Sequence, residues 1–244
     1  MPGNDAVAGT FRASTSFEWK SLSLLANLLC LAALIDAVSL VADMVIRAAG
    51  IRRMLHPVFA PSLSTAGGGT SNAEPMRPMG FRMLDNLLQN MHYPLQLLLY
   101  VLIACWLYQA VQNANARGAI GLGRPGRAAT LCLTPGVNLI WSVFYLDRLW
   151  RASIDMRGWQ HRSTPLLVPV WWMVWLASVI SIRLTIYLGD SIERYIRFER
   201  RLIEHDAISL LALLLTVVVI QRVTQAQRQP MVTSQLVATE GSLE

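Results

Sequence analysis

The chain has 244 residues, of which 54% are hydrophobic and only 15% are charged. Ordinary soluble domains carry about 25% charged residues, so this composition argues against a soluble protein. The formal net charge of +6 comes almost entirely from arginine, which we interpret as anchors that flank membrane segments. Nucleic-acid binding would need a basic face with interleaved aromatic side chains on a folded domain, and the sequence predicts no such domain. We therefore expect an integral membrane protein that is in contact with the lipid bilayer.

The first membrane span is expected over about residues 21–46, after a polar N-terminal tail of residues 1–20. Its apolar run is too long for the apolar region of a signal peptide, and it has no clear small-residue cleavage site. The span carries Asp36 and Asp43, which are seven residues apart and therefore on nearly the same helical face. A carboxylate at the centre of a span costs about 2.5 to 3.5 kcal/mol on insertion scales, so we expect Asp36 to face protein or water.

A long connection follows the first span, and its stretch 57–78 has the Pro, Gly, Ser and Thr content of a flexible loop. Residues 81–90 predict a short helix that lies on the membrane, with its leucines on one side. The second span is expected over about residues 93–111, with aromatic side chains near its ends, as is typical of interfacial positions.

The next apolar segment, residues 128–152, is broken in the middle. Pro135 removes a backbone donor and Gly136 adds conformational freedom, so the helix should kink or end there. Asn138, three residues past the proline, could satisfy a freed backbone group. Because non-helical backbone at membrane depth must be buried in protein or face water, we predict a re-entrant or half-inserted element with a candidate helix-break site at Pro135, Gly136 and Asn138.

The second half of this segment, residues 139–152, predicts an amphipathic helix at the membrane interface, with Asp147, Arg148 and Arg151 on its polar face. The third span is expected over about residues 165–188 and begins with a tryptophan cluster. That cluster could form a stacking platform for a ligand, but interfacial anchoring is the better interpretation. The candidate anchors are Trp141, Trp150, Trp171, Trp172 and Trp175.

The chain beyond Asp190 is strongly charged, and Glu193 and Arg197 at i, i+4 indicate a solvated helical extension. The last span is expected over about residues 205–223. Residues 21–228 would then form a single helical membrane domain, followed by a polar C-terminal tail of residues 229–244.

Arg183 lies within the third span, and the topology decides which acid could pair with it. With four spans, the first and third run in the same direction, so Asp36, Asp43 and Arg183 lie in the same half of the membrane. An acid–base pair there would relieve the cost of both charges. With five spans, Arg183 lies at the opposite end from Asp43, and the distribution of arginines barely separates the two topologies. We favour four spans with both termini cytoplasmic.

The sequence predicts no metal site, cofactor or catalytic residue. Its three cysteines lie in separate apolar segments, and its four histidines lack ligand spacing. Asp36 and Asp43 lie on one helix about 10 Å apart by rise, whereas an aspartyl mechanism needs two acids that converge on one site.

Several motifs in the second half of the chain together resemble a bacterial membrane family known as domain of unknown function 4328, over roughly residues 99–227. Two positions depart from the family pattern, since Arg127 replaces the usual aromatic residue after Pro-Gly and Trp141-Ser142 replaces a frequent Arg-Pro. The resemblance implies a multi-span protein of a bacterial inner membrane and supplies no activity. The motifs are Trp106-Leu107-Tyr108-x-Ala110 with Asn113, Arg117-Gly118-Ala119, Pro125-Gly126, Pro135-x-x-Asn138-Leu139, Leu149-Trp150-Arg151-Ala152-Ser153, Trp171-Trp172-x-x-Trp175 and Arg222-Val223-Thr224-x-x-Gln227.

Three functional hypotheses follow. The first is a non-enzymatic protein that binds, senses or passes a small polar solute or ion, because broken helices with free backbone groups form the sites of carriers and filters. The second is a scaffold or regulatory subunit with a membrane-protein partner or a second copy of itself. The third, an intramembrane enzyme, is the least favoured.

Overall fold

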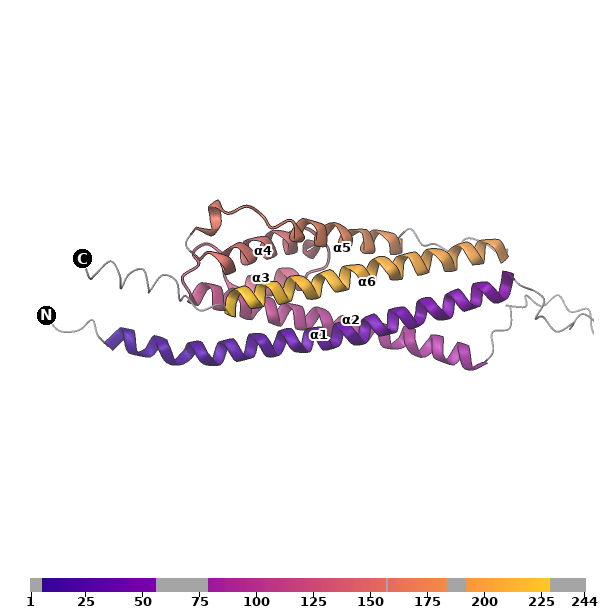
Figure 1. The fold of residues 1–244 in the computed structure, drawn as a ribbon, viewed down its shortest axis with the longest axis horizontal. Coiled ribbons are helices and arrows are strands. Elements are labelled where there is room, and N and C mark those ends of the chain that lie inside the picture. Colours follow the sequence, from indigo (N-terminus) through magenta and orange to yellow (C-terminus); the bar gives the residue numbers. More distant parts are fainter. Residues whose placement is uncertain (1–5, 56–78, 157, 184–191, 229–244) are drawn as a thin grey trace, which may run out of the picture. The chain divides into compact units, whose positions relative to one another are not determined.

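The computed structural model describes residues 6–55, 79–156, 158–183 and 192–228. Within these ranges the chain is helical apart from short connections and has no strand, which confirms the predicted all-α class. In chain order the elements are α1 (Ala6–Leu55), α2 (Met79–Ala116), α3 (Pro125–Leu133), α4 (Val137–Ile154), the short 3₁₀ helix η2 (Trp159–His161), α5 (Leu167–Arg183) and α6 (Ile192–Arg228) (Figure 1).

Three of these helices are long and apolar enough to cross a membrane, and they contain the first, second and last of the predicted spans. Their candidate spans are longer than predicted because the helices continue into flanking polar residues. These candidate spans are Leu22–Arg52 in α1, Asn90–Ala116 in α2 and Glu193–Arg228 in α6.

The third predicted span, residues 165–188, corresponds to α5, which has 17 residues. At 1.5 Å per residue its length is about 26 Å, somewhat less than the about 30 Å of a hydrocarbon core. The predicted continuation over residues 184–188 lies outside the described residues, as do the predicted loop 57–78 and the tail 229–244.

Two helices extend into segments that the sequence assigned differently. α1 begins at Ala6, so most of the predicted N-terminal tail is helical. α2 begins at Met79, so the predicted separate surface helix of residues 81–90 is instead continuous with the second span, through Pro94.

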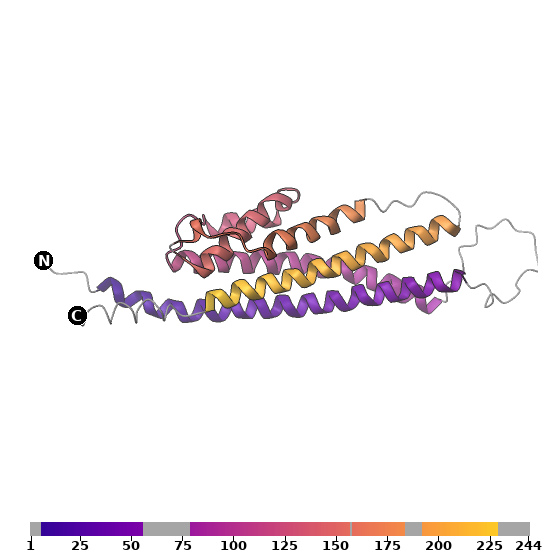
Figure 2. The same ribbon diagram turned by 45° about the horizontal axis from the view of Figure 1, so that its top comes forward.

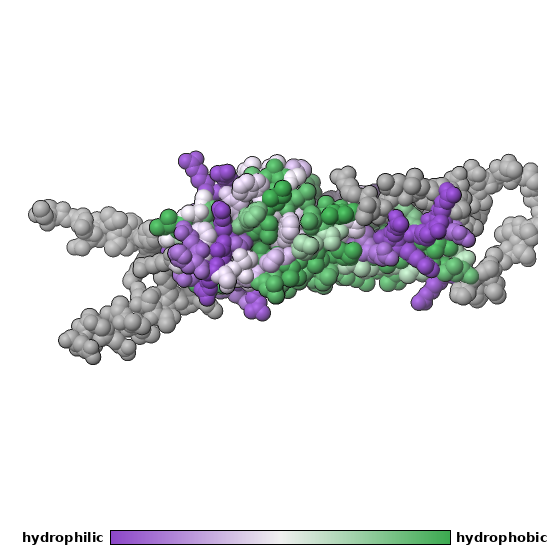
Figure 3. Space-filling model, turned by 90° about the horizontal axis from the view of Figure 1, so that it is seen from above, coloured by the Kyte–Doolittle hydropathy of each residue, from purple (hydrophilic) through white to green (hydrophobic). Residues whose placement is uncertain are grey.

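Large apolar side chains are exposed along α1, for example Leu34 (61%), Val38 (62%) and Val45 (63%). Their spacing of four and seven residues places them on one helical face. Soluble monomers rarely expose contiguous apolar patches larger than a few hundred Å². The visible face in Figure 3 is largely green, and its hydrophilic residues gather in patches. Such faces are suited to contact with lipid.

The chain divides into two compact units. Unit 1 comprises Met1–Leu31, Leu99–Trp172 and Thr216–Glu244, and unit 2 comprises Ala32–Leu98 and Met173–Leu215. Each unit therefore combines segments that are distant in the sequence, and α1, α2, α5 and α6 contribute to both.

The core of unit 1 is closed by polar contacts between α2 and α6. The indole Nε1–H of Trp106, which is 1% exposed, donates to Thr224 Oγ1 over 3.1 Å. One turn further along both helices, Gln227 Nε2 donates to the Ala110 carbonyl and to Ser153 Oγ, each over 3.0 Å. Because both contacts advance in the same direction, α2 and α6 run parallel in this unit.

Candidate functional site

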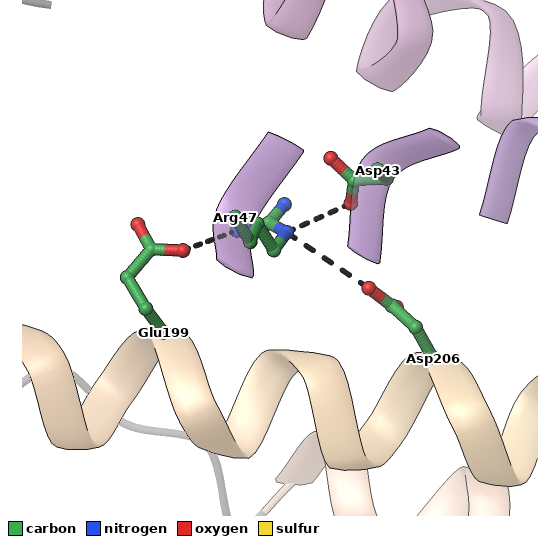
Figure 4. Close-up of polar contacts among 4 residues, drawn as sticks. All are labelled: Asp43, Arg47, Glu199 and Asp206. Carbon is green, nitrogen blue, oxygen red and sulfur yellow. Dashed lines mark hydrogen bonds and ion pairs between the residues drawn. The ribbon is translucent and has the colours of Figure 1, made fainter. Parts of the chain in front are cut away.

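The most concentrated polar site is a buried cluster around Arg47 in unit 2. The Arg47 guanidinium donates from Nε to Asp43 Oδ2 over 2.8 Å and from Nη1 to Glu199 Oε2 over 3.0 Å. Asp206 Oδ2 lies 3.9 Å from the same Nε atom. Figure 4 shows the guanidinium of α1 facing both acids of α6. We call these four residues the Arg47 cluster.

Helix periodicity explains how the cluster forms. Asp43 and Arg47 are four residues apart on α1 and therefore adjacent on its surface. Glu199 and Asp206 are seven residues apart on α6, two turns along one face. A single arginine side chain can thus contact both acids of the facing helix.

The cluster is largely closed to solvent, since Arg47, Glu199 and Asp206 are 8%, 4% and 7% exposed. Two of its carboxylate oxygens, Asp43 Oδ1 and Asp206 Oδ2, are buried and accept no hydrogen bond from the described residues. An ionised carboxylate without compensating partners is costly to bury. The cluster therefore has buried acceptor capacity that its own side chains leave unused.

A second polar group in unit 2 centres on Asp36, which is 4% exposed. His92 Nδ1 of α2 lies 3.0 Å from Asp36 Oδ1, and Gln96 Nε2 lies 2.7 Å from His92 Nε2. Because an amide nitrogen only donates, this order fits a histidine ring that carries its proton on Nδ1 and donates it to Asp36.

A third polar contact joins α5 to α6 in the same unit. Ser181 Oγ lies 2.7 Å from His205 Nδ1 and donates to the Ser178 carbonyl over 2.8 Å. All four helices of unit 2 thus contribute polar side chains to contacts between helices.

The predicted charge pair is only partly within the described residues. Asp36 and Asp43 are both positioned by protein partners, His92 and Arg47 respectively. The side chain of Arg183 lies outside the described residues, so its pairing with either acid stays a prediction.

Sequence reasoning missed Arg47, His92, Glu199 and Asp206. The segment after Asp190 was predicted to be solvated, and this is wrong for Glu199, which is buried. The available indication was the pair of acids seven residues apart on α6 beside the Asp43–Arg47 spacing on α1.

The predicted helix-break residues lie between α3 and α4. α3 ends at Leu133 and α4 begins at Val137, and Gly136 has φ of +79°, a conformation that favours glycine. The backbone N–H of Asn138 donates to the Thr134 carbonyl over 3.0 Å, which carries the hydrogen bonding across the break.

α3 and α4 pack against each other as a hairpin in unit 1 (Figures 1 and 2). The connection before α3 and the one after α4 also meet, because Trp159 Nε1–H donates to the Ile120 carbonyl over 3.1 Å. The hairpin therefore leaves and returns at the same end of the unit.

Burial on α3 raises the pKa of the Cys132 thiol to about 11.

Part of the predicted polar face of α4 contacts protein. Arg151 donates to Asp147 and to the Arg162 carbonyl, and its guanidinium lies 5.5 Å from the centre of the Trp159 ring. Arg148 is exposed. An interfacial position of α4 stays a prediction.

The predicted tryptophan anchors differ in their surroundings. Trp141 is 42% exposed, whereas Trp150 and Trp171 are each 8% exposed. Trp171 Nε1–H donates to Thr216 Oγ1 over 2.8 Å and Trp172 Nε1–H to the Leu139 carbonyl over 2.7 Å. Trp175 is half-buried. These contacts tie α5 to α6 and α4 in unit 1, and anchoring at the interface stays a prediction.

Comparison with known proteins identifies one family. A family model described as "Domain of unknown function (DUF4328)" matches residues 81–225, which is more than half of the chain. No curated protein and no solved structure matches the chain.

Proposed function

This chain belongs to the DUF4328 family, and we propose that it is a non-enzymatic integral membrane protein that binds or passes a small polar solute or ion at the Arg47 cluster. The observation that carries the proposal is the pair of buried oxygens without hydrogen bonds, Asp43 Oδ1 and Asp206 Oδ2. Ionisable residues inside membrane segments are costly and commonly mark the paths of ions or substrates. The cluster lies on candidate spans of α1 and α6.

The proposed topology has four spans, with α5 as the third and the α3–α4 hairpin as a re-entrant element. The hairpin leaves and returns at one end of unit 1, which supports an even number of crossings. The parallel course of α2 and α6 supports the same arrangement, because α2 and α6 would be the second and fourth spans. We place both termini in the cytoplasm and the protein in a bacterial inner membrane, with the arginines between α2 and α3 on the cytoplasmic side.

A flux assay tests the proposal. The full chain is reconstituted into vesicles that contain either a pH-sensitive or a cation-sensitive dye, and ion gradients are applied across the membrane. We expect flux above that of protein-free vesicles, a strong loss of flux in Asp206→Asn and Arg47→Gln, and no loss in Arg200→Gln, whose side chain is exposed on α6.

Two results would contradict the proposal. One is vesicles that are no more permeable than protein-free ones to any ion or small polar solute tested. The other is flux that is unaffected in both cluster variants, which would place the path elsewhere. Loss of an accompanying membrane protein on purification of the variants would instead favour a scaffold.

A further inference from the structure

The described interior of unit 2 carries more acidic than basic groups. Four buried or largely buried carboxylates face one permanent cation, Arg47, and two histidines, His92 and His205, that are positive only when protonated. If every acid is ionised, at least one negative charge remains, and three remain when both histidines are neutral. The groups that face this interior are Asp36, Asp43 and Arg47 from α1, His92 from α2, the hydroxyls of Ser178 and Ser181 from α5, and Glu199, His205 and Asp206 from α6.

Uncompensated charge is costly in such a place. An isolated ionised carboxylate in an apolar medium is so unfavourable that the group takes up a proton instead. The excess must therefore be met by a bound proton or by another cation.

Asp206 is the acid least supported as an anion. Asp36 lies within hydrogen-bond distance of His92, and Asp43 and Glu199 each accept a short hydrogen bond from Arg47. Asp206 lies 3.9 Å from that guanidinium, which is too far for a hydrogen bond, and its Oδ2 accepts none from the described residues.

Asp43 is the candidate acceptor, because its carboxyl group shares the Nε atom of Arg47 with Asp206. The Oδ2 atoms of Asp43 and Asp206 both approach Arg47 Nε, at 2.8 and 3.9 Å, so they are no farther apart than the sum of these distances. A protonated carboxyl group donates one O–H hydrogen bond, and Asp43 Oδ1 is an unused buried acceptor. Two adjacent carboxyl groups that share one proton are an established arrangement.

A proton fits the site better than a metal ion. A metal ion would lie beside the positive guanidinium of Arg47 and would need several oxygen ligands. In the part of the chain that the structure describes, no group of three His, Cys, Asp or Glu residues is arranged to hold one. A proton needs one oxygen and one acceptor.

We infer that Asp206 holds a proton that it shares with Asp43 at neutral pH, and that this proton is the ion of the proposed function. Binding converts the Asp206 carboxylate to a neutral carboxyl group, and release returns the proton to water and restores the carboxylate. The Asp43 side chain keeps 15% of its surface exposed, so the pair is not fully sealed. The identity of the ion rests on the proposed function, whereas the bound proton does not.

Infrared difference spectroscopy of the full chain in nanodiscs tests this inference without any transport. A protonated carboxyl group has a C=O stretching band that a carboxylate lacks, and exchange into D₂O shifts it. We expect the band at neutral pH in the unmodified protein, its shift in D₂O, its loss in Asp206→Asn and its displacement in Asp206→Glu. Glu204→Gln, an exposed change two residues away, should leave it unaltered. Circular dichroism confirms that each variant is folded.

The outcomes separate the two proposals. An absent band, a band that survives in Asp206→Asn, or a band that does not shift in D₂O would overturn the inference. If the side chain of Arg183 supplied the compensating cation, the band would be absent from the unmodified protein and would appear in Arg183→Gln. Flux of a solute without the band would leave the proposed function standing, while the exchanging band without any flux would overturn only the proposed function.

Discussion

Removing the guanidinium of Arg47 should lower the free energy of unfolding by about 3–5 kcal/mol, the usual cost of breaking a buried ion pair from one side. Arg47 donates two short hydrogen bonds to carboxylates, over 2.8 and 3.0 Å. Each hydrogen bond to a charged group contributes about 1.5–3 kcal/mol, so these two account for the expected loss. In Arg47→Gln, the side chain is shorter and uncharged, and the acids of the cluster lose their cation.

The loss is measured by unfolding the full chain in mixed micelles with increasing dodecyl sulfate, followed by tryptophan fluorescence. Arg52→Gln, an exposed change on the same helix, is the matched control and should alter stability by less than about 0.5 kcal/mol. Adding Glu199→Gln to Arg47→Gln should recover part of the loss, because one stranded carboxylate is removed.

A loss below about 1 kcal/mol in Arg47→Gln would refute this reasoning, because it would mean that the buried acids are not held by Arg47. A double variant as unstable as the single one would refute the pairing with Glu199.

Three further changes probe unit 1. Trp106→Phe removes the buried donor to Thr224 and should cost about 1–2 kcal/mol in the same titration, and an unchanged midpoint would contradict this. Gly136→Ala should cost about 1–2 kcal/mol because of the positive φ at this position alone. The control, Gly126→Ala inside α3, should be neutral or stabilising. Equal effects of the two substitutions would contradict this prediction. The third change replaces Cys30 and Cys105, so that Cys132 is the remaining cysteine. Because burial raises the pKa of its thiol to about 11, Cys132 should react with a maleimide slowly at pH 7 and faster toward pH 11. Rapid labelling of the folded protein at pH 7 would contradict burial.

The parts of the fold that were predictable depend on local sequence. A long apolar run predicts a helix of matching length wherever it lies, and α1, α2 and α6 contain such runs. The break at Pro135 and Gly136 was likewise predictable, because a missing backbone donor and a permissive residue act at their own position. Helix ends were less predictable, since α1 and α6 continue into polar residues that have no apolar periodicity.

The site depended on pairing between distant helices, which no local pattern contains. Asp36 and Asp43 were identifiable because acids within an apolar run need a partner. Arg47 lies at the end of the same run and resembled a flanking anchor, and Glu199 lay among exposed arginines. Only the packing of α1 against α6 in unit 2 distinguishes these two residues from the solvated charges beside them.

The order in which the chain is made has a consequence for unit 1. Its core is closed by Thr224 and Gln227, which lie within the last turns of α6 and bond to residues of α2 and α4. Synthesis proceeds from the N-terminus, so the earlier helices are already made before these two side chains emerge. A chain that stopped before Thr224 would leave Trp106 and Ser153 without these partners. Completion of unit 1 therefore reports that the chain has been translated through the last turns of α6.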